Sequence, residues 1–350
     1  MVKKLLKVLL ILLLVVVITV GGLLVFLSVT EYRPKDVEII PVKGTGSGAV
    51  PSENLSILCW NVGYAGLGAE EDFFMDGGKR VRPDNREIVT GYLDGIRRSI
   101  MEHRPVDLVM LQEVDSNSAR TYSIDETDVL SRNCSAYALN YSCPFVPFPF
   151  PPIGKVHGGL LTTTDYEIRE AERISLPCPF SWPMRTANLK RCLLVCRLPV
   201  QDTGKELVLV NQHLEAYDNG EGKIAQTRQL MDLLQKEYRN GNYVIAGGDF
   251  NQIFPGSLQL WPNNHPDLWT PGILETESLP TGFQYVCDMT VPTCRLLNQP
   301  YDPADTVNTQ YYVIDGFIVS PNVTVDTVET LDFGFRNSDH NPVCITVSLG

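Results

Sequence analysis

The sequence lacks an excess of basic residues. It has 29 Lys and Arg against 41 Asp and Glu, which gives a formal net charge of −12. A protein that grips duplex nucleic acid usually presents a basic face, so this balance argues against tight nucleic-acid binding. It does not exclude it, because a bound divalent cation or a local basic cluster can reverse the potential in one cleft. Two such clusters, at 79–82 and 185–191, are typical of solvated surface or of phosphate contacts.

The nine cysteines lack the spacing of a zinc site. Their number is odd, so at least one has no intramolecular partner. Cys134 and Cys143 bracket a short polar stretch, as do Cys287 and Cys294, and either pair could form a local disulfide. Four others lie in apolar, strand-like runs and are typical of buried thiols: Cys59, Cys192, Cys196 and Cys344. This cysteine usage fits an extracytoplasmic location without proving it.

Only one long hydrophobic run is present, and it lies at the N-terminus. Lys3, Lys4 and Lys7 precede an uncharged run over residues 8–27, which as a helix would span about 30 Å, the thickness of a bilayer core. A cleaved signal peptide is the alternative, but its apolar core is normally only about 7–15 residues long, and residues 28–30 make a poor cleavage site. We therefore predict an uncleaved transmembrane anchor over 1–28, with the N-terminus cytoplasmic and the rest extracytoplasmic.

Beyond the anchor the chain has no internal repeat and only one linker-like stretch. Residues 29–53 hold three prolines and a glycine-rich segment at 44–48, so we predict a flexible linker there. Residues 54–350 are then a single catalytic domain. The proline-rich stretch at 143–152 is predicted to be a surface loop, either packed by its own side chains or forming a lip that faces substrate or membrane.

Hydrophobic periodicity within 54–350 predicts more strands than helices. Helical spacing occurs over 86–103 and 223–238. Strand-like runs occur at 55–60, 106–111, 159–163, 189–198, 206–211, 243–246, 311–319, 323–330 and 343–347. Several strands follow one another without an intervening helix, which argues against a simple doubly wound parallel sheet. We expect two packed mixed sheets flanked by helices.

Polar residues suited to metal binding stand where these apolar runs end or shortly after them. They are Asn61, Glu113, His213, Asp249, Asn251, Asp315, Asp339 and His340. A carboxylate after a strand is usually only a solvated cap, but strand ends of one sheet can converge, and six convergent ends would form one carboxylate-rich pocket. Carboxylate and amide oxygens are hard ligands that suit Mg²⁺, with Mn²⁺ as an alternative, rather than zinc.

These residues stand in short motifs that together resemble the endonuclease/exonuclease/phosphatase superfamily, which includes deoxyribonuclease-I-like nucleases, neutral sphingomyelinases and inositol polyphosphate 5-phosphatases. The motifs, in the family's order, are CWNV (59–62), LQEV (111–114), NQHL (211–214), GDFN (248–251), IDGF (314–317) and SDHNP (338–342). The resemblance covers the domain from about residue 55 to 348. It implies a four-layer α/β/β/α sandwich with the site at one rim of the paired sheets.

The resemblance also implies a role for each residue. Glu113 would be the principal metal ligand, with Asn61 beside it. Asp249 and Asn251 would border the scissile phosphate. His340 would be the general base, oriented by a carboxylate. His213 would bind a phosphate oxygen or assist the leaving group. Asp315 and Asp339 are the candidates for the orienting carboxylate, and one of them could instead help to bind metal.

The sequence therefore predicts a Mg-dependent hydrolase that cleaves a phosphodiester or phosphomonoester outside the cytoplasm. No Ser, Cys or Thr stands in a nucleophile motif, so direct attack by water is simpler than a covalent intermediate. The substrate could be nucleic acid, a lipid headgroup or a small metabolite, and no protein partner is evident. The alternative is a surface binding protein that kept the fold and lost catalysis. Such a protein should have lost motif residues, and all are present.

Overall fold

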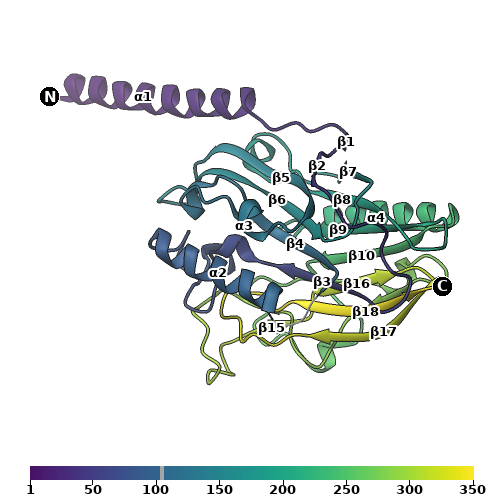
Figure 1. The fold of residues 1–350 in the computed structure, drawn as a ribbon. Helices are drawn as coiled ribbons and strands as arrows, with labels where there is room; N and C mark the ends of the chain where they lie inside the picture. Colours follow the sequence, from purple (N-terminus) through teal and green to yellow (C-terminus); the bar gives the residue numbers. More distant parts are fainter. Residues whose placement is uncertain (103–105) are drawn as a thin grey trace.

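The computed structural model describes residues 1–102 and 106–350. Two seven-stranded sheets lie face to face, with helices on their outer faces (Figure 1). The first sheet has the order β1 (Val37–Ile39), β7 (Glu170–Ser175), β8 (Cys192–Pro199), β9 (Glu206–His213), β10 (Tyr243–Asp249), β16 (Asp315–Val319) and β13 (Gln284–Val286). The second has the order β17 (Val323–Thr330), β18 (Val343–Leu349), β3 (Leu55–Asn61), β4 (Leu108–Asp115), β6 (Gly154–Thr164), β5 (Cys134–Val146) and β2 (Val42–Gly44).

Both sheets are mixed, as the sequence predicts. β3 pairs with β4, and β9 with β10, in parallel, whereas the other strand pairs within the two large sheets are antiparallel. Two small ladders lie beside the sandwich: β11 (Gln252–Ile253) with β12 (Gly272–Ile273), and β14 (Cys294–Arg295) with β15 (Tyr311–Tyr312).

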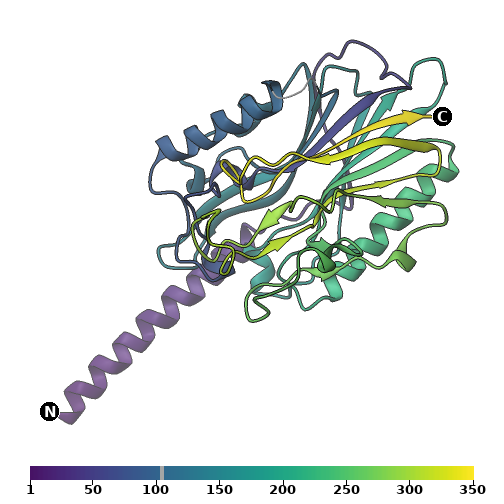
Figure 2. The ribbon, with the colours of Figure 1, turned by 90° about the horizontal axis from the view of Figure 1, so that it is seen from below.

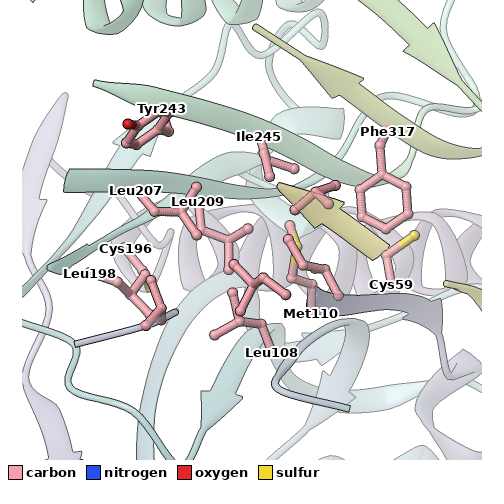
Figure 3. Packing of buried hydrophobic residues seen from close by; sticks show 14 of the residues in the cluster. Cys59, Leu108, Met110, Cys196, Leu198, Leu207, Leu209, Tyr243, Ile245 and Phe317 are labelled. Atoms are coloured by element: carbon pink, nitrogen blue, oxygen red, sulfur yellow. The ribbon is translucent and has the colours of Figure 1, made fainter. Parts of the chain in front are cut away.

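The central core is formed where the two sheets face each other. Leu108 on β4 meets Leu209 on β9 and Phe317 on β16 in one buried apolar cluster (Figure 3). Successive side chains of a strand point to opposite faces, so each sheet also has an apolar outer face. On β3, for example, Cys59 lies in the central core while Trp60 packs in a second cluster on the outer side.

Helices cover both outer faces and complete the predicted four-layer α/β/β/α sandwich. α2 (Arg86–Glu102) places Val89, Leu93 and Ile96 on the outer face of the second sheet, and the short α3 (Glu126–Leu130) lies beside it. α4 (Glu221–Arg239) covers the outer face of the first sheet. Both long helices fall where the helical spacing predicts them. His103, the last residue of the predicted first helix, lies outside the described residues.

The segment 29–53 differs from the predicted flexible linker. β1 pairs with β7, and β2 pairs with β5, so the segment supplies one edge strand to each sheet. Gly44, which was expected to prevent regular structure, lies at the end of β2 opposite Cys134. Each strand has only three residues, too few to show a period-2 pattern, and only backbone pairing with a partner distant in sequence creates them.

The region between Cys134 and Cys143 is also not the short polar loop that the sequence suggested. It belongs to β5, a 13-residue strand that pairs with β6. Because both cysteines lie on one strand, nine positions apart, they cannot reach each other. All nine cysteines are free, so neither of the two suggested disulfides is present. The surface loop predicted for 143–152 is shortened to the turn between β5 and β6.

The N-terminal helix α1 (Val2–Val29) is long and apolar enough to cross a membrane. Its last turns contact the domain, where Leu27 is buried beside Val146 and Ile153. In Figures 1 and 2, α1 projects from the end of the sandwich at which β18 begins, and the C-terminus lies at the opposite end. The polar residues of the sequence motifs gather at the end where β18 begins.

Candidate functional site

Strand pairing brings the predicted residues to one rim of the sandwich. On the first sheet, Asp249 at the end of β10 stands opposite His213 on β9 and Asp315 on β16. On the second sheet, Asn61 at the end of β3 stands opposite Gln112, next to Glu113. The segment 338–342 then enters β18 beside β3. All eight residues therefore lie at the same end of the two sheets.

A polar bridge between the sheets fixes the two halves of this rim. Gln112 Nε2 donates to Asn211 Oδ1 at 2.8 Å, and Asn211 Nδ2 donates to the carbonyl of Leu111 at 3.1 Å. Both side chains are fully buried, where a satisfied hydrogen bond is strongly preferred. Gln112 is next to Glu113 in the sequence, and Asn211 lies two positions before His213. The bridge therefore sets the relative positions of these two site residues.

Asn61 joins carboxylates from the two sheets. Its Nδ2 donates to Glu113 Oε1 at 3.2 Å and to Asp249 Oδ2 at 3.0 Å. Its Oδ1 accepts from the backbone N–H of Gly63 at 3.0 Å. Gly63 has φ +50, and a Cβ there would lie 2.9 Å from Asp339 Oδ1 and 3.0 Å from Leu67 Cβ, so a larger residue would crowd the turn beside the site.

Glu113 is held in an unusual backbone conformation. Its φ is +55, in the left-handed region, and the register of β4 against β6 shifts between Leu111 and Val114. A bulge of this kind turns a side chain out of the regular alternation of the strand. The Glu113 side chain is 25% exposed, whereas those of Asp249 and Asp315 are almost fully buried. Glu113 is thus the carboxylate at the mouth of the site.

Asp315 and His340 form a close pair at the bottom of the site. His340 Nδ1 lies 2.8 Å from Asp315 Oδ2, and the carbonyl of His340 accepts from Trp60 Nε1 at 2.8 Å. Burial alone would lower the pKa of His340, but the negative charges of Asp315 and Asp339 outweigh it and raise that pKa well above its usual value. Nε2, the other ring nitrogen, faces Asp249 and Asp339, with 3.8 Å to each carboxylate.

The surroundings of Asp249 and Asp339 disfavour the charged form of both carboxyl groups. Burial and then the charge of Asp315 raise the pKa of Asp249 to about 7. Burial raises the pKa of Asp339 to about 7 as well, helped by Glu113, although His340 opposes the shift. Both side chains are therefore poorly stabilised as anions by the protein alone.

His213 has the opposite electrostatic setting to His340. Its Nε2 lies 3.4 Å from Asp249 Oδ2, and its Nδ1 lies 4.0 Å from Glu113 Oε1. Burial, followed by the positive charges of Arg191 and His340, lowers the pKa of His213 well below its usual value. A neutral imidazole here has one ring nitrogen that can donate a hydrogen bond.

Asn251 reaches the rim but uses its side chain in the scaffold. Its Nδ2 donates to the carbonyl of Leu214 at 2.9 Å, and its backbone N–H donates to Asp249 Oδ1 at 2.8 Å. The residue has φ +50, a conformation that Asn tolerates better than most side chains. Asn251 therefore orients Asp249, and the role in contacting phosphate that the resemblance implies stays a prediction.

The donor set fits a divalent cation. In the described part of the chain, the ion pairs of Asp249, Asp315 and Asp339 are with histidines alone. Asp315 Oδ1 is buried without a hydrogen-bond partner. Ligand atoms of Asp249, Asp315 and His340 lie within 4.8 Å of one another, a spacing that could hold an ion. We favour the Glu113 side of the pocket, because His340 Nδ1 is already engaged by Asp315 and Glu113 is more accessible.

Two pairs of side chains near the site do not follow the end of a predicted strand, so the sequence alone does not point to them. Tyr217 Oη donates to Asp76 Oδ1 at 2.8 Å, and burial raises the pKa of Asp76 to about 6, with Glu113 adding to the shift. Arg120 binds both oxygens of Asp115, at 2.9 and 3.0 Å, and lies 3.6 Å from the centroid of the Tyr64 ring. Asp115 follows the LQEV motif by one position, so this pair braces the strand that carries Glu113.

Arginines of the two basic clusters form ion pairs and hydrogen bonds within the protein. Arg80 pairs with Glu71 at 2.8 Å. Arg191 is buried, where it binds the carbonyl of His213 at 3.1 Å and Glu215 at 3.3 Å. Of the second cluster, therefore, Arg191 touches the site, and it does so through the backbone of His213.

The Gly-Phe pair that follows Asp315 contributes to packing. Phe317 is fully buried in the central core. A Cβ at Gly316 would lie 2.7 Å from the ring of Phe254 and 2.7 Å from the carbonyl of Val286.

Comparisons with known proteins agree with this geometry. Solved structures with the same fold include endonuclease/exonuclease/phosphatase proteins from Bacteroides vulgatus (16% identity, TM-score 0.53, covering 85% of this chain and 99% of that one) and Beutenbergia cavernae (16%, 0.52, 85% and 72%). A third comes from Leptotrichia buccalis (16%, 0.51, 83% and 98%). At these identities the likeness shows the fold alone. No curated protein matches the chain.

The match to a protein family is more specific. The profile described as "Endonuclease/Exonuclease/phosphatase family" matches residues 58–340, most of the chain, and this span begins just before Asn61 and ends at His340. The chain therefore belongs to the endonuclease/exonuclease/phosphatase family.

Proposed function

We propose that the chain is a divalent-metal-dependent phosphoesterase that hydrolyses its substrate by direct attack of water. The observation that carries this proposal is the Asp315–His340 pair, set 3.8 Å from two buried carboxylates whose pKa values are raised to about 7. Such a pocket is costly to maintain in a protein that only needs to fold, because strongly perturbed ionisable groups in one cavity are typical of functional sites.

His340 would act as the general base. Asp315 holds Nδ1 and so leaves Nε2 as the nitrogen that can accept a proton from water. The same carboxylate stabilises the imidazolium that results. His340 is protonated too readily when all the surrounding carboxylates are anionic, so positive charge placed among them would bring its pKa back toward neutrality.

Glu113 and Asn61 would hold the metal ion, Mg²⁺ or Mn²⁺, with Asp249 or Asp339 close by. When bound, a divalent cation neutralises a non-bridging phosphate oxygen and stabilises the charge that develops during hydrolysis. For Asn61 to serve as a ligand, its Oδ1 would have to turn from Gly63 N toward Glu113, which a rotation of the amide provides.

His213 and Asp249 would contact the scissile phosphate. A neutral His213 can donate to a phosphate oxygen without repelling the cation beside it. Asp249 lies between the two histidines, 3.4 Å from His213 and 3.8 Å from His340, which suits a residue that aligns the attacking water. Asn251 would support it through the hydrogen bond to Asp249 Oδ1.

We also propose that α1 anchors the enzyme in a membrane, with the catalytic domain extracytoplasmic. The helix is long and apolar enough to cross a bilayer, and its three lysines lie at the N-terminal end. Protease treatment of intact cells tests the orientation. We expect the catalytic domain to be digested from outside, and protection of the domain would place it on the cytoplasmic side.

The enzyme proposal is tested with the full chain in detergent and a chromogenic phosphodiester, bis(p-nitrophenyl) phosphate. We expect turnover with Mg²⁺ or Mn²⁺, loss of turnover with chelator, and loss in Glu113→Ala. Glu221→Ala, which removes an exposed carboxylate at the start of α4, is the matched control and should leave turnover unchanged. Turnover that is insensitive to chelator and to Glu113→Ala would contradict the proposal, and ligand binding without product would favour the inactive binding protein.

A further inference from the structure

A group of large apolar side chains is exposed where α1 joins the domain. Phe148 (69% exposed) and Phe150 (96%) stand on the turn between β5 and β6. Trp182 (54%) and Met184 (64%) stand before β8, and Met184 is the first residue of the 3₁₀ turn η4 (Met184–Ala187). We call these four residues the aromatic lip. The two pairs stand on adjoining segments, because Tyr141 Oη on β5 donates to the carbonyl of Ala187 in η4 at 3.0 Å. Water solvates exposed apolar side chains poorly, and a group of them on one part of a surface is typical of an interaction site.

The lip is built on a packed base that includes the end of α1. Leu27 is buried with Val146 and Ile153 under the turn between β5 and β6. Trp182 Nε1 donates to Ser28 Oγ at 3.0 Å, so the lip and the last turn of α1 are joined directly. The base is further fixed by Glu31, which pairs with Arg185 and Lys190 at 3.3 Å each.

Strand direction puts the lip at the same end of the sandwich as the site. β6 runs antiparallel to β4 with Asp115 opposite Gly158, so the turn before β6 lies beyond the end of β4 that carries Glu113. β8 runs antiparallel to β9 with Leu193 opposite Gln212, so the segment before β8 lies beyond His213. Both halves of the lip therefore project past the rim where the site residues gather.

The lip and the site are also linked by short contacts. The ring of Phe148 lies 5.8 Å from that of Phe74, at an edge-to-face angle of 71°. Phe74 opens the 3₁₀ turn η2 (Phe74–Asp76), whose Asp76 accepts a hydrogen bond from Tyr217 beside the site. One short segment thus runs from the lip to the mouth of the pocket.

The direction of α1 indicates that a bilayer would lie against the aromatic lip. In Figures 1 and 2, α1 extends away from the end of the sandwich where β18 begins, which is the end that holds the site and the lip. If α1 crosses a bilayer, the bilayer lies on that side of the domain. Aromatic side chains are favoured at the boundary between headgroups and acyl chains, where an apolar ring can leave water.

We propose that the aromatic lip rests in the headgroup boundary of the bilayer that α1 spans, and that the substrate is a phosphoester carried by a lipid headgroup in that bilayer. The substrate assignment rests on the proposed function, whereas the seating of the lip does not. The net charge of −12 favours the same choice, because it repels a polyanionic nucleic acid more than a lipid surface already held in place by α1.

Seating of the lip is tested without activity. The full chain is reconstituted in phosphatidylcholine vesicles whose acyl chains are brominated near the headgroup, and quenching of tryptophan emission is measured. We expect Trp182→Phe to remove most of the quenchable emission. Trp261→Phe is the matched control and should leave it unchanged, because Trp261 packs on Tyr311 and donates to Met289 O instead. Quenching that is the same in Trp182→Phe as in the parent chain would overturn the proposal.

The substrate class is tested with the double variant Phe150→Asp/Met184→Asp, which keeps the contact between Phe148 and Phe74. Vesicles of phosphatidylcholine, phosphatidylethanolamine and phosphatidylglycerol are offered as substrate, and release of phosphorus-containing headgroup is compared with hydrolysis of bis(p-nitrophenyl) phosphate. We expect about a tenfold or larger loss on vesicles, because two charges must enter the boundary, and unchanged hydrolysis of the soluble diester. Met101→Asp, at an equally exposed apolar side chain (61%) on α2, should change neither.

The outcomes separate the two proposals. No metal-dependent turnover on either substrate defeats the proposed function and leaves the quenching result to decide the seating of the lip. Turnover of the soluble diester with none on vesicles overturns the lipid substrate. Equal vesicle turnover by the double variant and the parent chain overturns the role of the lip. Retained hydrolysis of the soluble diester shows that the double variant folds, and Phe150→Ser replaces it if that activity is lost.

Discussion

His213 and His340 lie in one pocket on either side of Asp249, yet their surroundings shift their pKa values in opposite directions. Burial acts on both rings and by itself lowers the pKa of each. Around His340 the negative charges of Asp315, at 2.8 Å, and Asp339 together outweigh burial and raise the pKa, whereas the positive charges of Arg191 and His340 add to burial at His213 and lower its pKa. Two chemically identical side chains are thereby given a protonated and a neutral state at the same pH.

The difference shows that the charges around a buried histidine determine which protonation state it favours. A ring backed by a carboxylate can take up a proton and keep it, as a general base must. A buried ring with positive charges nearby, such as that of His213, stays neutral and can serve as a hydrogen-bond donor. Neither task can be read from the histidine alone, because Asp315 is 25 positions before His340 in the sequence and Arg191 is 22 positions before His213.

The largest effect on kcat is expected from His340→Ala, and it tests whether the two histidines have different roles. Loss of a general base typically lowers the rate about 10²–10⁴-fold, whereas loss of one donor to a phosphate oxygen, in His213→Ala, should cost less, about 10²-fold. Both variants are compared by kcat for bis(p-nitrophenyl) phosphate at saturating Mg²⁺. A larger loss in His213→Ala than in His340→Ala would exchange the two roles.

Asp315→Asn is expected to have the next largest effect, about 10²-fold on kcat, and to move the pH profile. Removing the charge lowers the pKa of His340, and a base is active above its pKa, so the acidic limb of kcat/KM against pH should shift to lower pH. Asp202→Asn, in the exposed turn between β8 and β9, is the control for the change of residue type. An unshifted acidic limb would show that Asp315 does not tune His340.

The carboxylates between the two histidines predict a pH-dependent stability. Asp249 and Asp339 have a pKa of about 7 in the folded chain, against 3.8 for an ordinary aspartate, so the folded state holds more protons than the unfolded state between about pH 4 and 7. Without metal, stability should therefore fall as pH rises through this window. Added Mg²⁺ should raise Tm more at pH 8 than at pH 5, because the carboxylates are then charged and can bind it.

Differential scanning fluorimetry with chelator and with Mg²⁺ measures this effect. The matched variant, Asp249→Asn/Asp339→Asn, removes both titrating groups and should flatten the metal-free profile and abolish most of the Mg²⁺ response. A Tm that rises with pH between 4 and 7 in the metal-free parent chain would contradict the assignment. His340 adds a loss of the same sign at higher pH, while His213 contributes in the opposite sense below pH 6.5.

The sequence predicts the site better than it predicts the edges of the fold. An apolar run ends at or near each of four site residues: Asn61, Glu113, His213 and Asp249. This local pattern predicts the site because paired strands end at a common rim of the sheet. The two long helices and eight of the nine predicted strands have single counterparts for the same reason, since their periodicity reflects a buried face. The strand predicted over 311–319 is instead divided between β15 and β16, which belong to different sheets.

What sequence missed depends on contacts between distant segments. β5 is 13 residues long, but its Tyr, Asn, Ser and Pro residues hide the alternation, and only its pairing with β6 makes it a strand. The edge strands β1 and β2 are too short to carry a pattern. Asp76 and Tyr217 meet across 141 positions from two loops, so no local rule could join them to the site.

The smallest expected effect comes from removing the charged neighbour of His213. Arg191 and Glu215 form a buried pair, so both are replaced together, as Arg191→Met/Glu215→Met, to leave no unpaired charge. Burial is the largest cause of the lowered pKa of His213 and persists in this variant, so the pKa should rise only slightly and remain below its usual value. Nuclear magnetic resonance titration of the His213 ring measures the shift. Recovery of an ordinary histidine pKa would mean that the guanidinium, rather than burial, keeps His213 neutral, and the contrast with His340 would then be one of charge alone.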